Sequence, residues 1–108
     1  MEQLKHELKE RYKATFKECQ RLGYRPGYFI KMLNSGNDVV EITKRLACKA
    51  GGTQGFATLS KMRRLDLTIE NIILEPKFRV LFPAEVLRAA YKKLEELGYD
   101  GLSKIKIP

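Results

Sequence analysis

One stretch of the sequence has the residue order of a metal-dependent nuclease. Asp66 precedes Glu75-Pro76-Lys77, and in such nucleases carboxylates hold a divalent cation while a lysine orients the attacking water. Those enzymes set the groups on paired strands, whereas here a proline takes the middle position and the surrounding periodicity is helical. We therefore expect Asp66 to cap a helix and Glu75 and Lys77 to be solvated. A nuclease subunit is the weakest of three alternatives for the function.

Other catalytic and metal-binding arrangements find no support in the sequence. His6 is the only imidazole and has no neighbouring Ser or Cys, and Cys19 and Cys48 lack the spacing of a redox pair or a metal knuckle. The glycine-rich segment Lys49–Gly55 could contact a phosphate, but it lacks the Gly-Lys-Ser/Thr ending of a nucleotide-hydrolysing loop. The sequence thus predicts a non-enzymatic protein with no metal and no small-molecule cofactor.

Basic residues recur at every fourth position of the first predicted helix. A step of four residues advances by about 40° around an α-helix, so these cations form a ridge about 24 Å long beside the apolar stripe. Like charges four residues apart repel each other, and a helix without a partner for them more often alternates signs. The alternative is an ordinary solvated lysine-rich face. The predicted ridge consists of Lys5, Lys9, Lys13, Lys17 and Arg21.

A second basic cluster ends the fourth predicted helix. Lys61, Arg63 and Arg64 lie where cations complement the helix dipole. The third predicted helix would extend this surface through Lys44, Arg45 and Lys49. The two helices also allow a helix-turn-helix interpretation in which residues 53–63 enter a major groove, but the connecting loop is long and few groove-reading side chains follow Gln54. We therefore expect contacts to phosphates rather than to bases.

The net charge of +8 is concentrated in the first two-thirds of the chain. Residues 1–66 hold 14 basic and 7 acidic side chains, whereas residues 67–108 hold 7 and 6. The length of 108 residues, with 44% hydrophobic and 31% charged, is typical of one soluble globular domain. No apolar run could span a bilayer, and the N-terminal segment lacks the apolar part of an export signal. We expect a cytoplasmic protein without membrane contact.

Apolar periodicity predicts an all-α fold with about five to six short helices in one domain, residues 1–99, followed by a tail, residues 100–108. Leu-Gly-Tyr ends both the first and the last long helix, which is typical of a Schellman-type stop. A strand is the competing interpretation for the β-branched segment Thr68–Leu74. The first three helices are expected from Glu2 to Leu22, from Pro26 to the Asn34-Ser35-Gly36 breaker, and after a cap at Asn37 or Asp38. The next three are expected from Phe56 to near Arg64, after a cap at Asp66 or Thr68, and from Ala84 to Leu97.

Five strings along the chain form one pattern. The strings are Gly23-Tyr24-x-Pro26-x-x-Phe29-x-x-Met32-Leu33, Gly55-Phe56-x-x-Leu59, Arg64-Leu65-Asp66-Leu67-Thr68-x-Glu70, Leu74-x-Pro76-x-Phe78-x-x-Leu81-Phe82 and Leu97-Gly98-Tyr99. This pattern resembles a small bacterial helical domain family of unassigned function, some members of which occur in restriction or nuclease contexts. The resemblance extends from about Tyr12 to Tyr99. It implies a bacterial origin and a helical fold, and it supplies no activity and no catalytic residue.

The predicted function is nucleic-acid binding by a small, basic, non-enzymatic domain. The partner is expected to be DNA rather than RNA, contacted mainly at phosphates by the ridge and by the cations at 61–64. The context of such a domain would be a bacterial nuclease or defence system. The alternative is a protein-interaction module of a bacterial assembly, in which the basic surface meets an acidic partner. An exposed apolar patch beside the ridge would favour that alternative.

Overall fold

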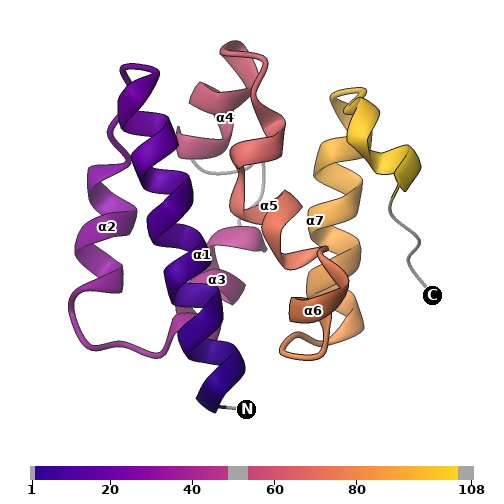
Figure 1. Ribbon diagram of the computed structural model, residues 1–108. Helices are drawn as coiled ribbons and strands as arrows, with labels where there is room; N and C mark the ends of the chain where they lie inside the picture. Colours follow the sequence, from indigo (N-terminus) through magenta and orange to yellow (C-terminus); the bar gives the residue numbers. More distant parts are fainter. Residues whose placement is uncertain (1, 49–53, 105–108) are drawn as a thin grey trace.

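In the computed structural model, which describes residues 2–48 and 54–104, every regular element is a helix (Figure 1). The all-α prediction is therefore confirmed, and these ranges contain no strand. None of these helices is both long and apolar enough to cross a membrane. The elements are α1 (Glu2–Arg21), α2 (Gly27–Leu33), α3 (Val39–Ala47), α4 (Gln54–Lys61), α5 (Ile69–Ile73), α6 (Pro76–Arg79) and α7 (Ala84–Glu96), with the 3-10 helices η1 (Leu65–Leu67) and η2 (Asp100–Lys104).

Helix α1 buries the stripe that its periodicity predicts. Leu8, Tyr12, Thr15 and Cys19 are all buried, because positions three or four residues apart share one face of a helix. The Tyr12 hydroxyl lies 2.7 Å from the Thr43 hydroxyl, which ties α1 to α3 inside the core. Burial raises the pKa of the Tyr12 hydroxyl, so Tyr12 stays neutral and keeps this hydrogen bond.

The short helix α5 lies at the centre of the domain. Figure 1 shows it between α1 and α2 on one side and α7 on the other. It packs against α7, α3 and α6, and its Ile72 and Ile73 side chains are 0% exposed. Because a five-residue helix is marginal by itself in water, these tertiary contacts provide most of its stability.

A side-chain cap explains why the segment after Thr68 is helical. Thr68 Oγ1 accepts a hydrogen bond from the Asn71 backbone N–H at 3.2 Å and donates to the Leu65 carbonyl at 2.7 Å. The cap satisfies a backbone donor that would otherwise lack a partner, and it directs the chain into a helix despite the β-branched residues that follow. Of the two expected caps Thr68 is correct, and the strand interpretation is wrong.

The two Leu-Gly-Tyr sequences end their helices as predicted. Gly23 has φ of +91° and Gly98 has φ of +69°, a region that glycine enters without a steric penalty. The Tyr24 N–H donates to the Cys19 carbonyl at 2.9 Å, and the Tyr99 N–H donates to the Leu94 carbonyl at 3.1 Å. These bonds back across the last turn define the Schellman motif.

The helical domain continues past Tyr99, into the segment expected to be a tail. Residues 100–104 form η2, and Leu102 is 8% exposed within the core. Leu97 is the C-terminal cap residue of α7 and is 48% exposed. Residues 105–108 of the expected tail lie outside the described part.

Candidate nucleic-acid interface

The predicted ridge winds around α1 from its flank to its solvent side. Lys5 and Lys9 are half-buried beside the core-facing stripe, whereas Lys13, Lys17 and Arg21 are exposed. This follows from helix geometry, because each step of four residues turns the next cation about 40° further from the stripe. The C-terminal half of the ridge is therefore the part that a large partner could contact.

Ion pairs neutralise part of the ridge. Three of its five cations have a carboxylate within 4 Å, whereas Lys9 and Lys17 form no ion pair with any described residue. The two local pairs at exposed cations, Lys13 with Glu10 and Arg21 with Glu18, contribute little to stability and can exchange for other anions. The pairs are Lys5 with Asp38 at 2.8 Å, Lys13 with Glu10 at 3.4 Å and Arg21 with Glu18 at 2.5 Å.

Tertiary structure joins the end of the ridge to the cluster that follows α4. The Glu18 carboxylate accepts a hydrogen bond from Arg21, and its Oε2 lies 3.9 Å from Arg64 Nη2. In Figure 1 the C-terminal end of α1 and the turn after α4 lie at the same end of the molecule. We call this surface the basic end; its cations are Lys17, Arg21, Lys61, Arg63 and Arg64.

Within the basic end, the paired and unpaired cations can be told apart. Arg64 donates two hydrogen bonds of 3.0 Å to the Asp66 carboxylate, and this pairing holds the pKa of Asp66 below its usual range. Lys61 and Arg63 are exposed and form no ion pair with a described residue. Lys17, Lys61 and Arg63 are thus the cations of this surface that have no carboxylate partner of their own.

Arg63 has an unusual backbone conformation. It is the only described non-glycine residue with positive φ, at +60°. The Arg64 N–H donates to the Leu59 carbonyl at 2.9 Å and the Arg63 N–H donates to the Ser60 carbonyl at 3.0 Å, so α4 ends in the same motif as α1 and α7. An arginine therefore takes the position at which the other two helices have glycine, although the left-handed conformation is unfavourable for it.

The cations on α3 form a separate group. Lys44 pairs with Glu41 at 3.4 Å, and Arg45 is exposed without an ion pair among the described residues. No hydrogen bond or ion pair connects these two to the basic end. Residues 49–53 lie outside the described residues. They include Lys49, and the expected phosphate contact and the helix-turn-helix interpretation both involve this segment.

The nuclease-like pattern is dispersed into three ion pairs. Asp66 pairs with Arg64, Glu75 accepts from Arg11 at 2.9 Å, and Lys77 lies 2.5 Å from Glu7. His6 is exposed, Cys19 is buried and Cys48 is exposed. Within the described ranges, no three His, Cys, Asp or Glu side chains are arranged to hold a metal ion.

Sequence reasoning missed the residue that connects the two basic segments. Glu18 precedes Arg21 by three residues, a spacing that predicts their local pair, but nothing in the sequence indicates its approach to Arg64, 46 positions later. Comparisons of the chain with protein-family models, with curated proteins and with solved structures found no match. The candidate interface therefore rests on its own geometry.

Proposed function

We propose that this protein binds nucleic acid through phosphate contacts centred on the basic end. The observation that carries the proposal is Arg63, an exposed arginine without a carboxylate partner, held at a helix stop where glycine would be less strained. Unfavourable backbone conformations in proteins cluster at functional sites, where the surrounding structure holds them in place. Arg63 lies in the turn directly after α4, two residues after Lys61.

Three cations of the basic end are the main contacts in this proposal: Lys17 on the ridge, and Lys61 and Arg63 at the end of α4. None of the three forms an ion pair with a described carboxylate, so a phosphate need not displace an existing ion pair. Neutralising three phosphates of duplex DNA gives a slope of about −2.7 for log affinity against log salt concentration. Contacts of this kind fix position on the backbone and do not read sequence.

The test is a salt titration of a fluorescently labelled DNA duplex, followed by anisotropy. The double variant Lys61→Gln/Arg63→Gln should weaken binding on unrelated sequences alike and make the slope less steep by about 1.8, because two phosphate contacts are lost. The matched control is Arg88→Gln/Lys92→Gln, which removes two exposed, unpaired cations from α7. Absence of binding at low salt, or equal weakening by the control, would contradict the proposal.

DNA rather than RNA is the proposed nucleic acid, and the proposed setting is a bacterial cytoplasm. A nuclease or restriction system as its context rests on the resemblance alone. A duplex RNA of the same sequence checks the preference. The alternative partner, an acidic protein, would be favoured by an apolar patch beside the ridge. In the described part, the large apolar side chains that are exposed are Val80, after α6, and Leu97, at the end of α7, so they belong to neither α1 nor α4.

A further inference from the structure

A cavity of about 380 Å³ enters the core beside α1. Its volume falls within the range of small-molecule sites. The cavity is lined from α1, α2, α4 and α5, together with Leu46 of α3 and the segment between α1 and α2.

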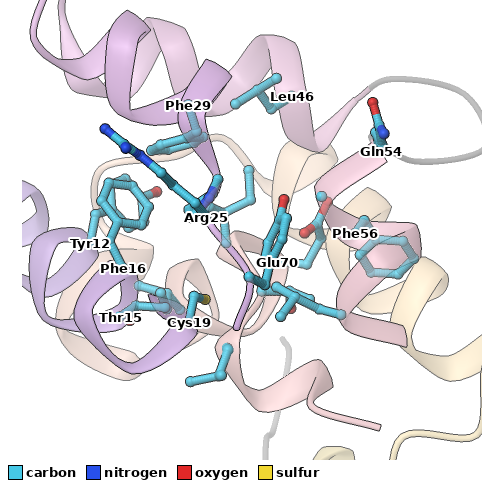
Figure 2. Close-up of a pocket in the computed structure, with 18 of the residues that line it drawn as sticks. Tyr12, Thr15, Phe16, Cys19, Arg25, Phe29, Leu46, Gln54, Phe56 and Glu70 are labelled. Atoms are coloured by element: carbon cyan, nitrogen blue, oxygen red, sulfur yellow. The ribbon is translucent and has the colours of Figure 1, made fainter. Parts of the chain in front are cut away.

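The cavity is apolar in its depth and polar at its mouth. Tyr12, Cys19 and Ile72 lie behind its inner wall and are at most 1% exposed. The apolar side chains that offer accessible surface to the cavity include Phe16, Phe29 and Ile69, which are partly exposed. Three of the aromatic side chains that line it contact one another: Tyr12 contacts Phe29 edge-on at 5.1 Å between ring centroids, and Phe16 contacts Phe29 at 5.3 Å. Arg25 and Gln54 also line the cavity and are exposed, so they mark its opening to solvent (Figure 2).

The polar groups inside the cavity are already satisfied. Glu70 is 1% exposed, and its Oε2 accepts a hydrogen bond from Lys93 at 2.7 Å. Thr15 Oγ1 accepts from Arg11 at 2.7 Å, and Thr68 caps α5. Figure 2 shows Glu70 in the middle of the lining, with Phe56 on one side and the Tyr12, Phe16 and Phe29 group on the other. No polar group in the depth therefore calls for a polar ligand.

Arg25 gives the mouth its charge. It is exposed and forms no hydrogen bond or ion pair with a described residue, whereas the other charged lining group, Glu70, is neutralised by Lys93. A ligand that fits this arrangement has an apolar body for the inner end and a single anionic group for Arg25. An arginine fork suits a carboxylate, which can accept two parallel hydrogen bonds.

We propose that this cavity binds a medium-chain carboxylate, with its hydrocarbon chain against Phe16, Phe29 and Ile69 and its carboxylate on Arg25. The proposal rests on the cavity and does not depend on nucleic-acid binding. Binding moves methylene groups out of water, so each added methylene should strengthen affinity about fourfold until the cavity is full. The charge-assisted hydrogen bonds to Arg25 should favour the carboxylate over the matching alcohol about tenfold or more.

The experiment compares hexanoate, octanoate, decanoate, decanol and decyltrimethylammonium, each below its micelle-forming concentration, by calorimetry and by amide chemical shifts of the full chain. Decanoate is expected to bind best and to shift the amides of Phe16, Cys19 and Ile69, residues that line the cavity. Equal affinity for decanol or decyltrimethylammonium would overturn the proposal. Amide chemical-shift changes that do not saturate and that spread to Val80 and Leu97 would overturn it as well.

Two variants localise the contact. Arg25→Gln should weaken decanoate about tenfold and leave decanol unchanged, whereas Arg88→Gln on α7 should change neither. The Cys48→Ser protein keeps one thiol, Cys19, at the inner end of the cavity. Bound decanoate should slow the reaction of that thiol with a thiol reagent in proportion to occupancy. An unchanged rate at saturating decanoate would place the ligand elsewhere and refute the site.

Discussion

Lys93 Nζ lies 2.7 Å from Glu70 Oε2, and the Glu70 side chain is 1% exposed. This ion pair connects α7 to α5 inside the domain, and the same ammonium lies 5.3 Å from the centre of the Phe56 ring. Burial raises the pKa of Glu70, and the positive charge of Lys93 acts in the opposite direction. Lys93 therefore compensates the negative charge of a carboxylate that lies in the wall of the cavity.

Removing Lys93 should destabilise the protein strongly. Lys93→Met leaves a buried carboxyl group without its partner, which typically lowers the free energy of unfolding by about 3 kcal/mol or more. Because the pKa of the remaining Glu70 is raised, the protonated form favours the folded state, and the loss should grow as pH rises above about 4.3, the ordinary pKa of a glutamate. Urea unfolding at mildly acidic and at alkaline pH measures both effects.

The control for Lys93→Met is Lys92→Met, since Lys92 is exposed and has no ion pair among the described residues. Its free energy of unfolding should change by less than about 0.5 kcal/mol. Adding Glu70→Gln to Lys93→Met should abolish the growth of this loss in unfolding free energy with pH. A loss that stays constant with pH in the single variant would mean that Glu70 does not carry the effect.

Replacing Arg63 by glycine should stabilise the protein. The φ of +60° is unfavourable for a residue with a Cβ atom, and glycine removes that penalty, for a gain of about 1 kcal/mol in the free energy of unfolding. Arg63→Ala is the matched variant, because it removes the same side chain and retains the Cβ atom. Denaturant unfolding should rank glycine above alanine, while both variants weaken DNA binding alike. Equal stability of the two would show that the conformation is not strained.

Thr68 should be one of the most sensitive polar positions. Its 2%-exposed side chain caps α5 and also donates to the Leu65 carbonyl, so Thr68→Ala should lower the free energy of unfolding by about 1–2 kcal/mol. Thr68→Ser keeps the hydroxyl and should lose much less. The two variants are compared by urea unfolding followed by circular dichroism, and similar losses would show that the methyl group rather than the cap matters.

Asp38 should give the protein part of its acid sensitivity. Asp38 Oδ1 accepts from the Val40 N–H at 2.8 Å, which confirms one of the two expected caps of α3. The hydrogen bond from Lys5 is the largest cause that holds the pKa of Asp38 below its usual range. Its stabilising effect is therefore present above about pH 3.9 and is lost as pH falls through the lowered pKa.

Asp38→Asn retains a capping oxygen and loses the charge, so it should be less stable than the natural protein at neutral pH. The difference should shrink as pH falls below about 3.9 and through the lowered pKa of Asp38, because the aspartate then loses its charge as well. Glu95→Gln, at an exposed carboxylate of α7 without an ion pair among the described residues, is the control. A difference that persists at low pH would assign the effect to the shape of the cap instead of its charge.

Local patterns sufficed for most of the fold. The stripe through Leu8 and Tyr12 predicted the buried face of α1, and Gly23 and Gly98 predicted where two helices end, because both signals depend on residues within one or two turns. The segment after Thr68 was ambiguous, since β-branched residues also suit a strand, and the hydroxyl cap decided it. The order beyond Tyr99 was not foreseen, since it depends on the long-range burial of Leu102.

The sequence by itself determined which residues are charged, which face of each long helix is apolar and where those helices stop. Only the tertiary structure decided which cations are neutralised, because Lys5 meets Asp38 and Arg64 approaches Glu18 from distant parts of the chain. It also decided that Glu70 is buried against Lys93 and that Arg25 stands at the mouth of a cavity. Ion pairs and cavities depend on distances between elements, and periodicity fixes only the arrangement within each element.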